Sequence, residues 1–161
     1  MPSPVKPSRP ARSEPIRLYY GGRVDAAAKL VDLARTLGAS EPDPRRFLAE
    51  LGRRGAGVRR GPLWFLDAGR GGRNTISGTG VKPEFDDGTR GQIRHFTGTA
   101  ATVARVGSRA TRWATLHILR DGPDTADGRL SEAAIAFAEA LLSGELAPRD
   151  ASDWIARNIV A

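Results

Sequence analysis

Apolar side chains that recur at every third or fourth position constrain the second half of this chain more than any other feature. This spacing places them on one face of an α-helix, and that face must then pack against a core. The pattern appears in four stretches, which are residues 90–106, 109–119, 129–144 and 148–160. These stretches predict a helical bundle over residues 90–161.

The first half predicts a helical hairpin over residues 17–52. Its first helix spans residues 24–37, with apolar side chains on one face, and Gly38 is expected to end it. The second helix has an N-cap, a proline at the first helical position and a glycine after its end, supplied by Asp43, Pro44 and Gly52. This punctuation indicates where the second helix begins and ends.

Two other segments carry little that could be buried. Residues 1–16 hold five prolines, which predicts a disordered basic arm. Residues 53–89 are rich in glycine and arginine, which predicts a long irregular connection. We therefore expect a mainly α fold, with a single compact domain of about five to six helices over residues 17–161.

The charge of the chain favours anionic partners. It has 25 Lys and Arg against 18 Asp and Glu, for a net charge of +7. Such an excess is typical of proteins that bind nucleic acid or an acidic protein surface, although arginine-rich composition alone also arises in GC-rich genomes. The candidate anion-binding residues are Arg53, Arg54, Arg59, Arg60, Arg70 and Arg73.

Several functions are disfavoured by what the sequence lacks. The chain has no cysteine, so it has neither disulfides nor zinc–thiolate sites. It also lacks the glycine patterns of dinucleotide and P-loop sites, so we expect no cofactor. No apolar run approaches the roughly 18 residues that span a bilayer, and no signal peptide is recognisable. We expect a cytoplasmic protein, or one exported without a signal peptide. We expect no membrane partner. The protein could also be part of a larger assembly.

The two histidines are the main candidates for catalysis. His117 shares an apolar stripe with Trp113, which predicts a core position, whereas Arg94 and His95 lie at the flank of their helix. A helical hairpin that turns at residues 107–108 would place the two imidazoles at similar heights along the paired helices. They could then divide general acid and base work on a phosphodiester, with Arg94 or Arg120 stabilising the developing negative charge.

The segment from Asp121 to Glu132 is the one locally acidic stretch. These two residues have the outer spacing of a calcium-binding loop, but Pro123 and Ala126 occupy positions that need a ligand and a glycine. We therefore predict no metal site. The simpler interpretation is that Asp124 or Asp127 begins the next helix, where a carboxylate stabilises the helix N-terminus.

Three stretches of the second half form a recognisable pattern: "DDGTRGQIRHF", "HILRDGPDTADGRLSEAAIAFAEALLSGEL" and "DWIARNI". Through them, residues 84–160 resemble a group of bacterial helical proteins found as modules of secreted or injected polypeptides. The chain matches an Asp…Arg-His-Phe…Asp pattern at Asp87, Arg94, His95, Phe96 and Asp127. Relatives tend to have asparagine after the last aspartate, where this chain continues with Gly-Arg-Leu. The resemblance implies that Arg94, His95 and Asp127 belong to one site, and it carries no activity over.

Two functions remain as hypotheses. In the first, the protein is a basic helical interaction module that binds an anionic partner, either nucleic acid or an acidic surface. In the alternative, it is a small effector-like hydrolase or nuclease. Its catalytic residues would be His95, His117, Arg94 and Asp127, together with the loop from Asp121 to Glu132.

Overall fold

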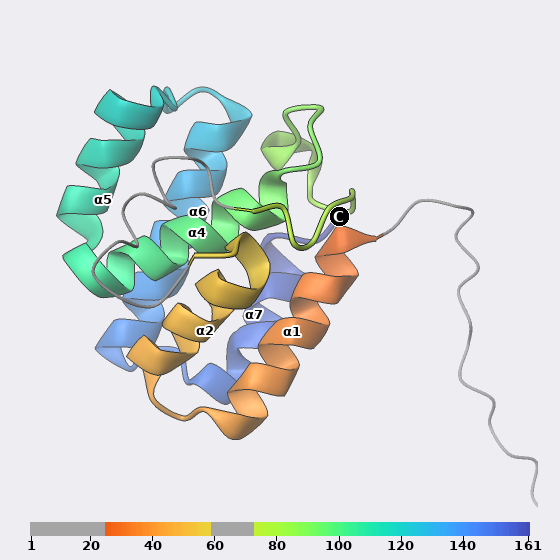
Figure 1. Ribbon diagram of the computed structural model, residues 1–161, viewed down its shortest axis with the longest axis vertical. Coiled ribbons are helices and arrows are strands. Elements are labelled where there is room, and N and C mark those ends of the chain that lie inside the picture. The colour runs from red at the N-terminus through yellow and green to blue at the C-terminus, as the bar shows by residue number, and fades with distance from the viewer. Residues whose placement is uncertain (1–24, 59–72) are drawn as a thin grey trace, which may run out of the picture.

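The computed structural model describes residues 25–58 and 73–161, and Figure 1 shows them as a bundle of helices. This part of the chain forms six α-helices: α1 (Ala26–Ser40), α2 (Pro44–Ala56), α4 (Gln92–Val106), α5 (Ser108–Ala114), α6 (Ala126–Ser143) and α7 (Ala151–Asn158). Its only β pairing consists of two isolated bridges, Asp25 with Thr79 and Val81 with Val160. The predicted mainly α fold is confirmed. The predicted arm, Arg59, Arg60 and Arg70 lie outside the described residues.

Three shorter helical segments complete the described part. They are the 3₁₀ helices η1 (Pro83–Phe85) and η3 (Pro148–Asp150), and the π-helical segment η2 (Thr115–Leu119), which continues α5 directly. The beginning of α2 is as predicted: Pro44 is its first residue, and the Asp43 side chain accepts a hydrogen bond of 2.8 Å from the Arg46 N–H. This cap satisfies one of the backbone donors that a helix N-terminus leaves without a partner.

Both helices of the first half run further than predicted. Helix α1 continues through Gly38 to Ser40, and α2 continues through Gly52 to Ala56. The residue that ends α2 is Gly57, whose φ of 66° lies in the left-handed region that favours glycine. The prediction that residues 53–89 form one loop region is therefore wrong at its start, because Arg53 and Arg54 belong to the last turns of α2.

The glycines inside α2 let it approach α4 closely. A Cβ on Gly52 would lie 2.3 Å from the Cβ of Ala101, and a Cβ on Gly55 would lie 2.5 Å from the hydroxyl oxygen of Thr97. A real side chain cannot occupy either position without moving one helix. Gly52 is thus a packing residue, and the contact with α4 outweighs the cost of glycine in a helix interior.

Aromatic rings mark the centre of the core. Phe137 of α6 is fully buried, and its ring centroid lies 6.5 Å from Phe47 of α2, 5.4 Å from Phe96 of α4 and 5.0 Å from Trp154 of α7. Helices α2, α4, α6 and α7 therefore meet at one side chain. Pairs of rings at these distances add to the stabilisation from burial alone.

The irregular segment over residues 73–91 is tied to both ends of the described chain. The Arg73 N–H donates to the Ala56 carbonyl at 2.8 Å, and the Thr75 hydroxyl contacts the Arg54 carbonyl at 2.6 Å. Further along, the Ala26 N–H donates to the Thr79 carbonyl, and the Lys82 N–H donates to the Ile159 carbonyl. These bonds hold the segment that leads into α4.

Helix α5 does not fold back along α4. Figure 1 shows it rising at a steep angle from the end of α4, so the two helices form a corner at Gly107 rather than a hairpin. The Arg112 side chain fixes α5 to α6: its Nε lies 3.0 Å from Glu132 Oε2, and its Nη1 lies 3.2 Å from Glu139 Oε1. Glu132 and Glu139 share one side of α6 because they are seven residues apart.

Candidate functional site

His95 lies in the first turn of α4 and reaches across to α6 and to the loop before it. Its Nε2 is 2.7 Å from the Ser131 hydroxyl oxygen and 3.7 Å from Asp121 Oδ2. The side chains of His95 and Asp121 are 17% and 11% exposed. We call His95, Asp121 and Ser131 the His95 cluster, and it joins three segments that are separate in the sequence.

The loop that carries Asp121 is folded tightly over the start of α6. The Asp121 N–H donates to the Thr115 carbonyl at 3.0 Å, and both the N–H and the hydroxyl of Thr125 bond to the Gly122 carbonyl. That carbonyl also approaches Gly128 so closely that a Cβ on Gly128 would lie 1.9 Å from its oxygen. Gly128 therefore allows the contact that keeps Asp121 in place.

The loop part of the acidic segment is shorter than predicted. Helix α6 begins at Ala126, so more than half of the stretch from Asp121 to Glu132 is helical, and Glu132 pairs with Arg112. The N-cap is Thr125, whose hydroxyl accepts a hydrogen bond of 2.9 Å from the Gly128 N–H. The prediction that Asp124 or Asp127 begins the helix is wrong, although Asp127 does lie in its first turn, where a carboxylate is favourable.

The electrostatics of the His95 cluster centre on Asp121. Burial raises the pKa of Asp121, the attraction of His95 opposes that rise, and the nearby Asp127 carboxylate adds to it. Oδ2 of Asp121 is buried and accepts no hydrogen bond within the described part of the chain. The carboxyl group is therefore held where its charge is poorly solvated.

This geometry suits proton exchange better than nucleophilic attack. In a Ser-His-Asp triad, the aspartate and the serine contact opposite nitrogens of the imidazole. Here Ser131 and Asp121 both approach Nε2, and Ser131 is only 2% exposed. The half-buried His95 imidazole is left as the group that can give or take a proton, with Asp121 beside it.

The other predicted catalytic residues lie around the cluster or away from it. Asp127 is near enough to Asp121 to affect its pKa, whereas the Arg94 guanidinium folds back over Gly91. The ring of His117 packs on Trp113 at a centroid distance of 5.3 Å, and its side chain is exposed. No hydrogen bond, ion pair or ring contact joins His117 to the His95 cluster within the described residues.

The prediction that His117 lies in the core is wrong. The apolar stripe on which it lies is real, but that stripe faces solvent, since the Trp113 side chain is 59% exposed. The face of the helix that turns inward carries Thr111 and Thr115, which are both buried. Helical periodicity shows which residues share a face and not which face is covered.

The predicted anion-binding arginines fall into two groups. Arg53 and Arg54 both pair with Glu50, through Nη2 at 2.8 Å and Nε at 3.5 Å respectively. Arg73 is exposed and lies beside Gly57 at the end of the same helix. The structure thus brings three of the six predicted arginines together, and the other three lie outside the described residues.

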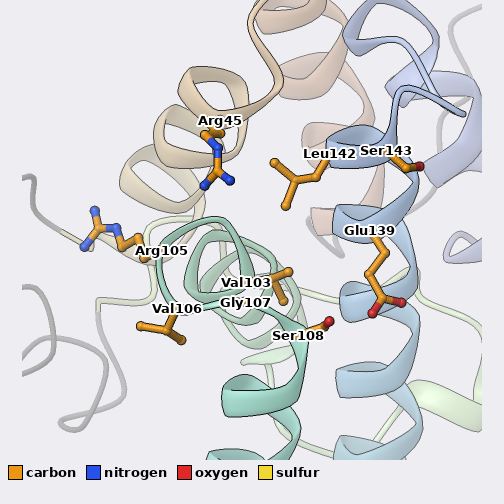
Figure 2. Close-up of a pocket in the computed structure, with 9 residues that line it drawn as sticks. All are labelled: Arg45, Val103, Arg105, Val106, Gly107, Ser108, Glu139, Leu142 and Ser143. Atoms are coloured by element: carbon orange, nitrogen blue, oxygen red, sulfur yellow. The ribbon is translucent and has the colours of Figure 1, made fainter.

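A shallow hollow of about 580 Å³ lies where α2, α4, α5 and α6 meet. Figure 2 shows Arg45 and Leu142 directed into it, while Arg105 and Val106 point away. Its charged groups already have partners, because Arg45 Nη1 donates to the Ala104 carbonyl at 2.7 Å and Glu139 pairs with Arg112. Arg45 and Glu139 are therefore engaged in contacts within the protein, and this hollow is a weak candidate for a ligand site.

Sequence reasoning missed Ser131 and the inward orientation of Asp121. Ser131 lies in the middle of a helical pattern, where a small polar residue usually faces solvent or bonds to the helix backbone. Its partner His95 is 36 residues away. No local signal connects them. The only sequence hint was that a glycine follows Asp127 in the first turn of a helix, where it is unfavourable unless something packs against it.

The fold and site together define an all-helical bundle with a half-buried His-Asp-Ser cluster. No protein-family model matches the chain, and no curated protein or solved structure shows significant similarity to it. None of the helices in the described ranges is both long enough and apolar enough to cross a bilayer. The same ranges contain no group of three or more potential metal-binding side chains.

Proposed function

We propose that this protein is a basic helical interaction module that binds an anionic partner, with the end of α2 as one contact site. The observation that carries this proposal is the grouping of Arg53, Arg54 and Arg73 on an exposed surface, where Glu50 is the acidic residue that pairs with Arg53 and Arg54 within the described part of the chain. The side chains of Arg53 and Arg54 are each 46% exposed. They remain accessible to a ligand while they pair with Glu50.

The local charge favours an anion. Among the described residues at the end of α2, the three arginines and Glu50 leave an excess of two positive charges. The exposed Arg90 lies close by, because its carbonyl accepts a hydrogen bond of 2.9 Å from the Asn74 side chain. The C-terminal end of a helix dipole repels anions, which weakens this attraction. We therefore expect binding that depends on charge more than on shape, with strong salt dependence.

A double neutralisation tests this proposal. The Arg54→Gln/Arg73→Gln variant removes two positive charges and leaves the shorter Arg53–Glu50 pair intact. The Arg149→Gln/Arg157→Gln variant is the matched control, because it removes two exposed arginines from η3 and α7. Binding of a single-stranded RNA and of heparin would be measured by fluorescence anisotropy over a range of salt concentrations.

We expect the first variant to bind RNA more weakly. The slope of log Kd against log salt should become shallower by about 1.4, the contribution of two phosphate contacts on a single strand. The control should bind as the unmodified protein does. Equal affinity and equal slope in both variants, with circular dichroism showing both to be folded, would contradict the proposal.

The alternative function, a small effector-like hydrolase, is favoured by one observation, the His95 cluster. In this hypothesis His95 moves the proton, and Asp121 stabilises the imidazolium that forms. His117 would contribute only through a substrate that reaches both α4 and η2. Cleavage of RNA or DNA that is lost in His95→Ala and retained in a folded His117→Ala variant would support a site at His95 alone. Cleavage that survives both changes would rule out both histidines.

A further inference from the structure

All the strongly exposed large apolar side chains of the described residues lie in one region of the molecule. Ile118 is 62% exposed and Trp113 is 59% exposed, while the exposure of the other three lies between 45% and 48%. We call this region the α5–η2 surface, and its members are Val106, Trp113, Leu116, Ile118 and Leu119. A group of large exposed apolar side chains in one region of a folded protein indicates an interaction site.

The buried side of the helix is polar, and Arg112 attaches the helix to α6. Thr111 and Thr115 are the buried residues of α5 and η2, and the Thr111 hydroxyl donates to the Gly107 carbonyl at 2.8 Å. Arg112 bonds to Glu132 and Glu139 of α6 through both sides of its guanidinium group. The apolar side chains therefore face solvent because the side that packs inward is polar.

The end of this helix projects from the molecule. Every residue from 116 to 120 is exposed, and Arg120 closes the segment with a φ of 60°, in the left-handed region. Apolar side chains thus point outward all around the tip, and they do not form a single flat face. A projection of this shape needs a deep complementary groove in a protein partner, whereas a lipid interface surrounds it without one.

The helix that forms the tip carries only basic charges, and the exposed Asp124 of the loop that follows offsets part of them. Residues 106–120 contain three arginines and neither aspartate nor glutamate. Arg112 pairs with Glu132 and Glu139 of α6, while Arg109 and Arg120 are exposed before Trp113 and after Leu119 in the sequence. Tryptophan with leucine or isoleucine, flanked by arginine, is the composition of helices that lie in the headgroup region of membranes.

We propose that the α5–η2 surface binds an anionic lipid bilayer. In this arrangement Trp113, Leu116, Ile118 and Leu119 enter the interfacial region, while Arg109 and Arg120 contact lipid phosphates. Binding of this kind needs no spanning helix. The sequence-based expectation of no membrane partner considered only spanning and targeting segments. This inference goes beyond the proposed function, because it concerns other residues and another partner.

The absence of cysteine from the chain makes a direct test available. A nitroxide spin label on Ile118→Cys reports on the tip, and the same label on Ala156→Cys, an exposed position of α7, is the matched control. Each labelled full-length protein would be mixed with vesicles of equimolar phosphatidylcholine and phosphatidylserine, or with vesicles of phosphatidylcholine alone. Accessibility to oxygen and to a water-soluble nickel complex measures the depth of the label.

We expect the label at position 118 to gain oxygen accessibility and to lose nickel accessibility with the anionic vesicles only. The label at position 156 should remain in water. In cosedimentation, Ile118→Ser/Leu119→Ser should lower the partition coefficient by at least about tenfold, because both side chains leave water on binding. The Ile118→Leu/Leu119→Ile variant, which preserves the apolar area, should partition as the unmodified protein does.

Three results would overturn the proposal. One is the absence of binding to the anionic vesicles by folded protein. Another is binding in which the label at position 118 stays in water, because the arginines elsewhere would then be responsible. The last is a dimer in light scattering that Ile118→Ser/Leu119→Ser converts to monomer without any vesicle binding, which would assign the surface to a second copy of the chain.

Discussion

Replacing Gly128 with alanine tests how the loop before α6 holds Asp121 against His95. The new methyl group would lie 1.9 Å from the Gly122 carbonyl oxygen. Ordinary van der Waals separation requires that oxygen to move by about 1.5 Å or more. The same oxygen accepts hydrogen bonds from the N–H of Thr125 at 2.9 Å and from its hydroxyl at 2.7 Å. The loop therefore cannot move without breaking its own turn.

The expected cost follows from these contacts. Overpacking in a tight contact costs about 1–3 kcal/mol, and the disturbed hydrogen bonds cost about 1 kcal/mol each. Alanine in place of glycine stabilises a helix by up to about 1 kcal/mol, which offsets part of this cost. We therefore expect Gly128→Ala to lower the free energy of unfolding by about 2–4 kcal/mol.

A second helical glycine provides the matched control. A Cβ on Gly98 of α4 would lie 3.4 Å from the Cβ of Ala56, which is close to ordinary contact. Gly98→Ala should therefore leave the protein as stable as before, or more stable by up to about 1 kcal/mol. Urea unfolding compares the two variants, and NMR of the His95 ring reports whether Asp121 has moved. If Gly128→Ala is as stable as Gly98→Ala and the His95 resonances are unchanged, the close loop contact does not exist.

Two further predictions concern the core and the cluster. Phe137→Ala should lower the free energy of unfolding by about 3–5 kcal/mol, because its ring is fully buried among other aromatic rings, and Phe137→Leu should cost less in the same urea assay. Because burial raises the pKa of Asp121, the folded protein binds more protons than the unfolded chain between the ordinary and the raised pKa, so stability falls as the pH rises through that window. Asp121→Asn should therefore be more stable than the unmodified protein at pH 7 and equal to it below about pH 3.9, whereas Asp124→Asn, at an exposed loop position, should show no such difference.

Much of the secondary structure follows from local chemistry. The apolar spacing around Phe96, Phe137 and Ile155 predicts helices because residues three or four apart share one side of a helix wherever it packs. Asp43 and Pro44 begin α2 for an equally local reason: a carboxylate caps free N–H groups, and proline fits the first turn. These features depend on neighbours along the chain, so the sequence alone was sufficient.

The candidate site was only partly accessible to such reasoning. His95 and Asp127 were expected near one another, and both lie around Asp121. The pairing of His95 with Ser131 was not predicted, because it depends on how α4 crosses α6. The expected approach of His117 to His95 required a hairpin, and α5 instead turns away at Gly107.

By itself, the sequence determined where most of the helices lie, which side of each helix is apolar and that the chain is basic. Tertiary structure decided which apolar sides of the helices are buried, which glycines allow close contact between helices and which polar groups lie together. The physical reason is that periodicity and capping are properties of neighbours in the chain, whereas burial depends on a partner element. Gly52 is a contact only because Ala101 lies against it, and the stripe at Trp113 is exposed only because Arg112 turns α5 toward α6.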